Sequence, residues 1–232
     1  MLQGEVKPIA AYEEDEICAM YRLMAEFYDD MSEDAFRRDF RQKDYCLLLR
    51  HETDGVVGFT TQKVMTFPLG GREITGIFSG DTIIHKRHWG DMQLFRTWAR
   101  FWFAYAARYD EFYWFLICKG YKTYCMLPLF FTEFYPDRRR PTPPYERRII
   151  DTYAAALYGD EYNPATGVIE YRRVKDKLKK GVADIGSREL KNKDIAFFTR
   201  ANPGYADGND LACLARLDRS ALKKQAEKIL FS

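Results

Sequence analysis

Apolar side chains recur at two different spacings along the first 136 residues of the chain. Apolar residues three or four apart predict helices over 13–29, 32–43, 91–109 and 121–136. Alternating or continuous apolar runs predict strands over 5–12, 74–85 and 111–120, and a hairpin over 45–67 around the turn "ETDG". The run at 111–120, "EFYWFLICKG", has no polar face, so we expect a strand that is buried on both sides.

The pattern is interrupted after residue 136, where "DRRRPTPPY" predicts a loop. Beyond it we expect a helix over 145–159, a strand-like run over 167–174, two strands around a turn over 194–217, and a closing helix over 220–230. This order predicts a mixed α/β (α+β) fold, with a mostly antiparallel twisted sheet flanked by helices. Residues 1–136 would form the core, and residues 137–232 would complete the sheet within the same structural unit as a helix, a hairpin and a closing helix.

Composition narrows the class of protein. The 232 residues carry 36 Lys and Arg against 34 Asp and Glu, a net charge of +2 that argues against nucleic-acid binding. The N-terminus lacks an apolar signal segment and no run of 18 apolar residues occurs, so we expect a soluble, cytoplasmic protein without a membrane span. The five cysteines form no CxxC pair and are expected to be reduced and buried. The three histidines lack companion ligands at metal-site spacing, so no metal is expected.

Residues 80–90, "GDTIIHKRHWG", end a β-branched strand, turn at a glycine and lead into the aromatic helix. A helix start offers unpaired N–H groups and the positive end of the helix dipole, so the basic side chains of this loop indicate an anion site. The alternative is a solvated basic connection that binds nothing. Gly80 lies inside the strand, which indicates a β-bulge or a close approach of another group to the backbone.

This order of elements, with "IFSGDTIIHKRHWG" leading into a helix, resembles the GNAT superfamily of acyl-CoA-dependent N-acyltransferases. The resemblance covers roughly residues 5–136. In that family a strand splits from its neighbour at a bulge, the pantetheine arm of the acyl thioester pairs with the exposed backbone, and the next loop holds the pyrophosphate against a helix start. The resemblance therefore implies that the donor is bound by Thr82, Ile83, Ile84, His85, Lys86, Arg87, His88, Trp89 and Gly90.

The pyrophosphate loop of the family reads Arg or Gln, two residues, Gly, one residue, then Gly or Ala. This chain offers Arg87, Gly90 and Met92 at the three fixed positions, and Asp91 could cap the helix start and repel a diphosphate. Acyl-homoserine-lactone synthases and N-acyl amino acid synthases are GNAT-like branches with divergent loops that use an acyl carrier protein. The resemblance thus implies acyl-CoA or an acyl carrier protein thioester as the donor. The arginines of "DRRRPTPP" would contact either donor, or form a solvated loop.

Acyl transfer to an amine needs a base, donors for the oxyanion and an acid for the departing thiolate. The resemblance implies that Asp81 is the base, acting through a water; alternatively its carboxylate ends the bulge by bonding backbone N–H groups. The usual acid of the family is a tyrosine on the following helix, at a position that falls near Phe130 or Phe131 here. Tyr124 and Tyr121 are the possible substitutes, and the alternative for Tyr124 is a ring in the core with a hydrogen-bonded hydroxyl.

The helix over 91–109 carries aromatic residues at three- and four-residue spacing, which favours a core face against the sheet. With "FYWFL" and "LPLFF", these rings could also line a tunnel for a long acyl chain or an aromatic acceptor. We therefore expect an N-acyltransferase, of the class that transfers groups other than amino-acyl, acting on the amine of a small molecule or amino acid. The alternative is a non-catalytic GNAT-shaped module that binds a thioester or a protein partner. Residues 137–192 could cover the sheet, provide the surface of a homodimer, or shape the acceptor pocket.

Overall fold

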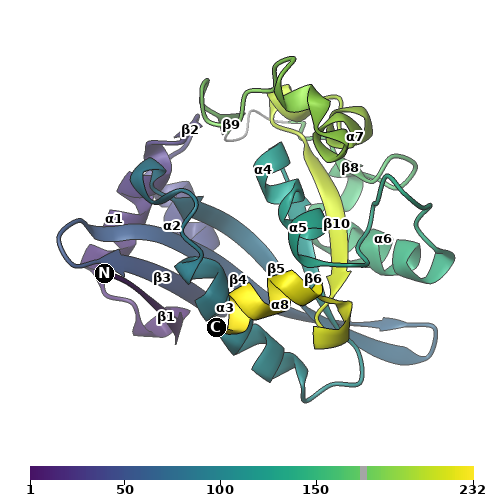
Figure 1. The fold of residues 1–232 in the computed structure, drawn as a ribbon, viewed down its shortest axis with the longest axis horizontal. Coiled ribbons are helices and arrows are strands. Elements are labelled where there is room, and N and C mark those ends of the chain that lie inside the picture. Colours follow the sequence, from purple (N-terminus) through teal and green to yellow (C-terminus); the bar gives the residue numbers. More distant parts are fainter. Residues whose placement is uncertain (173–176) are drawn as a thin grey trace.

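A computed structural model describes residues 1–172 and 177–232, which are built around an eight-stranded sheet (Figure 1). The strand order is β1-β3-β4-β5-β6-β10-β8-β7. β5 and β6 are parallel, whereas the other neighbouring strands described in this sheet are antiparallel. The expected mixed, mostly antiparallel sheet with helices around it is confirmed.

The strands of the large sheet are β1 (Leu2–Pro8), β3 (Tyr45–His51), β4 (Gly55–Leu69), β5 (Arg72–Ile84), β6 (Phe112–Cys118), β7 (Tyr162–Asn163), β8 (Val168–Ile169) and β10 (Asp210–Arg216). A second small sheet pairs β2 (Tyr28–Asp29) with β9 (Lys177–Leu178). The helices are α1 (Glu14–Ala25), α2 (Glu33–Phe40), α3 (Gln93–Ala106), α4 (Tyr121–Tyr124), α5 (Met126–Phe130), α6 (Pro144–Tyr158), α7 (Lys193–Ala201) and α8 (Lys224–Phe231). The last two residues of the strand expected over 167–174 lie outside the described residues.

Helices cover both faces of the sheet. On one face α3, α5, α7 and α8 share a core that includes Trp102 and Phe198, both without exposed surface. On the other face α1 and α2 pack around Phe40, and α6 packs against the sheet through Tyr153. The aromatic residues of α3 thus mainly form a core face, because Trp102 is fully buried among them. Every helix in the described part of the chain is too short or too polar to cross a bilayer.

β5 and β6 are paired over only part of their lengths. Their parallel register begins at Thr75 opposite Phe112 and ends at Ser79 opposite Leu116. Beyond Ser79, β5 continues beside β4 as far as Ile84, whereas β6 continues beside β10. The two strands therefore separate, and a gap opens between them.

A β-bulge lies where this gap opens. β4 and β5 shift register so that Gly80 and Asp81 are opposite the single residue Thr61, whose hydroxyl accepts the N–H of Asp81 at 3.1 Å. A Cβ at Gly80 would lie 2.9 Å from Cε of Lys43. Both features expected from Gly80, a bulge and a close approach to the backbone, are present.

The hairpin expected over 194–217 is wrong in its first arm, which is α7, while the second arm is β10. The side chain of Asn192 caps α7 by accepting the N–H of Asp194. Ile195 and Phe198, three residues apart, are buried beneath it. A short apolar run suits a helix or a strand, and here the cap and the packing decide for a helix. The extension does contain a hairpin elsewhere, formed by β7 and β8.

Residues 137–232 contribute both to the sheet and to its helical layer. β10 lies between β6 and β8, and α8 lies beside α3 (Figure 1). Arg96 of α3 donates to the carbonyl of Ile229 at 2.9 Å, and the rings of Phe103 and Phe231 are 5.5 Å apart. The division of the chain at residue 136 stays a prediction.

The three arginines of "DRRRPTPP" are each paired with an acidic residue. Arg139 and Arg140 contact the carboxylate of Asp137, which has no exposed surface, and Arg138 contacts Asp194 at 2.7 Å. Burial alone would raise the pKa of Asp137, but the hydrogen bonds from Arg139 outweigh it and lower this pKa below its ordinary value. Much of the charge of this loop is therefore neutralised within the fold.

The lowered pKa of Asp137 predicts a stability difference that depends on pH. We expect wild type to be more stable than Asp137→Asn at neutral pH, because the ionised carboxylate holds Arg139 and Arg140. A carboxyl whose pKa is depressed on folding stabilises fully above its unfolded pKa, about 3.9, and loses this as the pH falls through the folded pKa. Urea unfolding between pH 7 and pH 2 measures the difference, which should shrink towards the acid end. A difference that stayed constant would contradict the prediction.

Candidate active site

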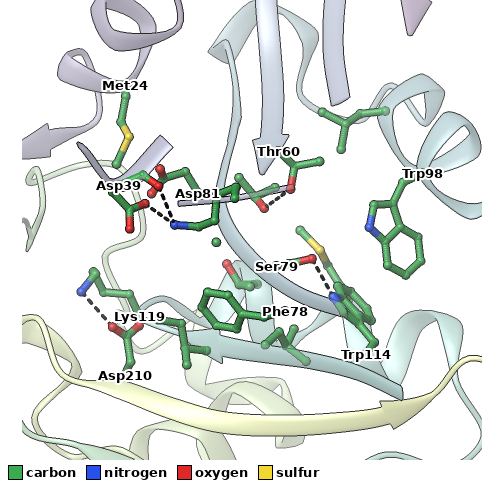
Figure 2. A pocket seen from close by; sticks show the side chains of 18 of the residues that line it. Met24, Asp39, Thr60, Phe78, Ser79, Asp81, Trp98, Trp114, Lys119 and Asp210 are labelled. Atoms are coloured by element: carbon green, nitrogen blue, oxygen red, sulfur yellow. Dashed lines mark hydrogen bonds and ion pairs between the residues drawn. The ribbon is translucent and has the colours of Figure 1, made fainter. Parts of the chain in front are cut away.

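A cavity of about 380 Å³ occupies the gap between β5 and β6 (Figure 2). The bulged segment 79–82 of β5 lines one side, and Leu116 and Ile117 of β6 line the other. One end of the cavity is polar and faces α2 and α6, whereas the other end is apolar and faces α3, α5 and α8. A volume of this size is typical of pockets that bind small molecules.

Four carboxylates, those of Asp30, Asp39, Asp81 and Asp210, and two ammonium groups line the cavity. Asp39 of α2 is ion-paired with Lys43, and Lys119 is ion-paired with Asp210 of β10 at 3.0 Å. Asp81 extends from the bulge on the same side (Figure 2). Four negative and two positive groups leave a net charge of −2 along the cavity lining, which suits a cationic acceptor such as an ammonium group.

Tyr158, the last residue of α6, lines the same polar end. Burial, followed by the negative charges of Asp210, Asp39 and Asp81, raises the pKa of Tyr158 well above its ordinary value. The hydroxyl therefore keeps its proton at neutral pH. A protonated phenol at this position can donate to a group on which negative charge develops.

The apolar end is formed by aromatic and aliphatic side chains. The rings of Trp98 and Trp114 are 4.6 Å apart, and the indole N–H of Trp114 donates to the hydroxyl of Ser79 at 2.8 Å. This hydrogen bond joins β5 to β6 at the last paired position before the gap. The helices contribute Leu94, Phe95, Thr123, Met126, Phe130 and Leu230. α3 lines the cavity through Leu94, Phe95, Trp98 and Phe103, and a tunnel for an acyl chain or an aromatic acceptor stays a prediction.

Beyond Ser79, where β5 is no longer paired with β6, some main-chain groups of β5 face the gap. The N–H of His85 donates to the carbonyl of Val57 at 2.8 Å, which marks a hydrogen-bonded pair of β4 and β5. Because such pairs alternate along an antiparallel ladder, Thr82 and Ile84 direct their N–H and C=O away from β4. The indole N–H of Trp89 donates to the carbonyl of Ile84 at 2.8 Å. Thr82 is therefore the residue of this segment whose backbone is best placed to pair with an extended ligand.

The loop after β5 reaches the start of α3 through a single 3-10 turn, Lys86–His88. Gly90 adopts a positive φ of 94°, which glycine adopts without strain. The carboxylate of Asp91 accepts the N–H of Gln93 at 2.6 Å. Asp91 thus occupies one donor of the helix start, as the sequence suggested it would.

Lys86 of this loop and Lys122 of α4 each lie over one of two neighbouring aromatic rings, those of Phe27 and Trp89, whose centroids are 6.2 Å apart. Nζ of Lys122 is 3.5 Å from the centroid of the Trp89 ring, and Nζ of Lys86 is 5.8 Å from the centroid of the Phe27 ring. Burial, and after it the positive charge of Lys86, lowers the pKa of Lys122. An anion bound between the two ammonium groups would relieve their repulsion. Their placement therefore supports an anion site at the loop.

The residues expected to bind the donor lie in different surroundings. Thr82 lines the cavity, whereas Ile83 is buried in the core beneath α1 and α2. His85 turns towards Glu26, with Nε2 3.5 Å from its carboxylate, and His88 turns towards Asp54. The remaining residues, Ile84, Lys86, Arg87, Trp89 and Gly90, belong to the strand end and the loop outside the cavity.

The structure does not bring Tyr124 to the cavity. Its side chain has no exposed surface, and its hydroxyl donates to the carbonyl of Pro136 at 2.9 Å. This is the arrangement of a core tyrosine with a hydrogen-bonded hydroxyl. Phe130 and Phe131, near the position that the resemblance gave for the family's tyrosine, line the cavity and carry no hydroxyl.

Sequence reasoning missed most of the polar end. Asp39 and Lys43 are four residues apart and could have been read as a helical ion pair. Lys119, Tyr158 and Asp210 are far apart in the sequence, and no local pattern connects them. They come together because β10 pairs with β6 in the sheet and because the C-terminal end of α6 lines the cavity.

No family model matches the sequence, and no curated protein matches it. Among solved structures, the chain is similar to a probable N-acyltransferase of unknown function from Enterococcus faecalis, with a TM-score of 0.41, 10% identity, and coverage of 57% of this chain and 33% of that chain. It is also similar to a GNAT family N-acetyltransferase (YhbS) from Escherichia coli in complex with CoA, with a TM-score of 0.39, 8% identity, and coverage of 56% and 69%. A glucosamine-6-phosphate N-acetyltransferase from Arabidopsis thaliana gives a TM-score of 0.35, 10% identity, and coverage of 46% and 76%.

These three similarities are low, and the chain spans only a third of the length of the Enterococcus protein. The strand order is the stronger observation. A meander of β3, β4 and β5 leads through a helix to a parallel strand, and the parallel pair splits at a bulge. The split between the strands and the loop before α3 lie where the resemblance drawn from the sequence expected them.

Proposed function

We propose that the protein is an N-acyltransferase that moves an acyl group from a thioester to an amine. The observation that carries this proposal is the split between β5 and β6, with a cavity that has a carboxylate-rich end and an apolar end. Two reactants of opposite character must meet in an acyl transfer to an amine. The polar end suits the ammonium group of the acceptor, and the apolar end suits the acyl chain.

In the proposed mechanism, the acceptor ammonium first loses a proton through a water to Asp81. The neutral amine then attacks the thioester carbonyl, and the main-chain N–H of Thr82 is placed to donate to the oxyanion. The nitrogen of the tetrahedral intermediate then loses its extra proton to water, and collapse of the intermediate breaks the C–S bond and forms the amide. Tyr158 protonates the departing thiolate and recovers a proton from Asp81, so that the enzyme returns to its starting state.

The donor would enter along the loop at 85–92, where Lys86 and Lys122 supply positive charge for its phosphates. The pantetheine arm would pair with the backbone of Thr82. Free acyl-CoA and the phosphopantetheine of an acyl carrier protein share this arm and a phosphate, so both belong to the proposal. The acceptor belongs to it as a small-molecule amine, which includes an amino acid.

Binding of the donor predicts a thermal shift that grows with acyl length. Ligand at about 100 times its Kd should add about 2.7 kcal/mol to the free energy of unfolding. Each methylene of the acyl chain that is buried at the apolar end of the cavity should strengthen donor binding by about 0.8 kcal/mol, a roughly fourfold gain in affinity. This gain should stop when the apolar end of the cavity is filled. Melting curves with CoA, acetyl-CoA, butyryl-CoA, octanoyl-CoA and an octanoyl acyl carrier protein measure this. Absence of a shift with the whole series would overturn the proposal.

A non-catalytic module that binds a thioester is the second candidate. The observations that favour it are the carboxylate of Asp91 at the helix start and the apolar residues Phe130 and Phe131 in place of the family tyrosine. The same melting series separates the two functions when thiol release is measured alongside it. A module would be stabilised by the donor but would release no free thiol in the presence of amines.

A further inference from the structure

Two of the three histidines meet beside the turn that joins β3 to β4. His51 is the last residue of β3, Asp54 lies in the turn, and His88 ends the 3-10 turn before α3. The imidazole rings of His51 and His88 are 5.1 Å apart. Each of the three residues can offer a ligand atom such that these atoms all lie within 4.8 Å of one another. Spacing along the sequence gave no sign of this cluster, because His88 is brought in by the course of β5.

The carboxylate of Asp54 lies between the two rings. Nε2 of His88 is 3.4 Å from one carboxylate oxygen, and Nδ1 of His51 is 3.8 Å from the other. With bonds of about 2.0–2.1 Å, neighbouring ligands of a tetrahedral zinc ion are roughly 3.3–3.4 Å apart. The first separation matches this value, and a change of a few tenths of an ångström in a side chain would bring the second into range.

Nε2 of His88 is buried and makes no hydrogen bond within the described part of the chain. The carboxylate of Asp54, 3.4 Å away, is not aligned for a hydrogen bond with this nitrogen, and a cation placed between the two would satisfy both. The hydroxyl of Thr53 lies 3.1 Å from Nδ1 of His51 and 2.9 Å from the carboxylate of Asp54. An ion bound to Nδ1 of His51 would replace the first of these contacts and leave the second.

We propose that His51, Asp54 and His88 form a binding site for a divalent transition-metal ion. Two imidazoles and one carboxylate are a ligand set that suits zinc, with a water in the fourth position. The side chains of His51 and Asp54 are 27% and 32% exposed, so solvent can reach that position. The ion would join the β3–β4 turn to the loop before α3 and so hold this loop in place. The proposal is independent of any acyl donor.

The test uses the full chain after removal of metal with a chelator, with cobalt(II) as the spectroscopic probe and zinc as the competitor. We expect one cobalt ion per chain, a visible absorption band that zinc abolishes, and a rise in Tm with zinc. His88→Ala and Asp54→Asn should each weaken binding about tenfold or more. His85→Ala is the matched control, because this histidine lies on the same loop but faces Glu26, and it should bind as wild type does.

Two outcomes would overturn the proposal. One is cobalt binding by His88→Ala and Asp54→Asn that equals wild type, which would place any bound metal elsewhere. The other is a loss in His85→Ala as large as in His88→Ala, which would indicate unspecific binding to exposed histidines. Two ligand variants are used so that the result stands even where one of them fails to fold. No donor or acceptor is present, so the outcome does not depend on the proposed acyl transfer.

Discussion

Asp81→Asn is expected to lower the turnover of acyl transfer about 100-fold or more while the protein stays folded. An asparagine fills the same space at the bulge, but its amide cannot take a proton from the acceptor ammonium. The N–H of residue 81 still reaches the hydroxyl of Thr61, because that bond comes from the backbone. The local structure that positions the side chain should therefore survive the substitution, and Tm should change little.

The effect of Asp81→Asn is measured as the rate of thiol release in the presence of a panel of amines. The donor is the one that stabilises the protein most in the melting series. Tyr158→Phe should also be slowed, by a smaller factor, since water can replace a phenol as the final proton donor. Asp207→Asn, an exposed carboxyl in the turn before β10, is the control and should react at the wild-type rate. Full activity of Asp81→Asn would remove Asp81 from the mechanism. Unfolding of this variant would instead assign the carboxylate to the stability of the bulge.

Gly76→Ala is expected to be the most destabilising of the proposed substitutions, at about 3 kcal/mol. Gly76 lies in the paired part of β5, opposite Tyr113 of β6. A Cβ at this position would be 2.3 Å from the carbonyl oxygen of Tyr113 and 2.8 Å from the ring of Phe115. Because one of these contacts is with backbone, the strands themselves must move apart, and overpacking of this kind costs up to about 3 kcal/mol.

Differential scanning calorimetry should show Gly76→Ala as a fall in Tm of roughly 6 to 12 °C for a chain of this size. Gly186→Ala is a matched control, because a Cβ there would approach only the end of the flexible Glu189 side chain, at 3.2 Å. Donor-induced stabilisation should weaken in Gly76→Ala as well, since the pairing of β5 and β6 sets the width of the gap. A Gly76→Ala protein as stable as wild type would show that β6 can shift without cost.

Much of the fold followed from local patterns. The helical spacing at 32–43 and the cap at Ser32 predicted α2, and the continuous apolar run at 111–120 predicted the doubly buried β6. Gly80, a glycine inside a strand pattern, predicted the bulge in β5. The failure at α7 came from a run of nine residues in which apolar positions suit either periodicity. A helix was selected there by the Asn192 cap and by burial against distant parts of the chain.

The candidate site followed from the sequence only in part. Asp81 was found because a bulge, a glycine and a following basic loop are neighbours in the chain. The groups around it, Lys43, Lys119, Tyr158 and Asp210, come from separate elements and have ordinary local surroundings in the sequence. The same holds for His88, whose two companions are more than 30 residues away. Tyr124 was selected by its position on a helix, and the structure turns it into the core.

The sequence by itself determined most of the elements of this protein, the β5 bulge and the character of the loop before α3, because each depends on residues close together in the chain. Tertiary structure decided where β5 and β6 part, which charges surround Asp81, and which histidines meet. Those features depend on strand order and register, which are set by packing between segments far apart in the sequence. The spacing of residue types along the chain does not reveal such long-range contacts.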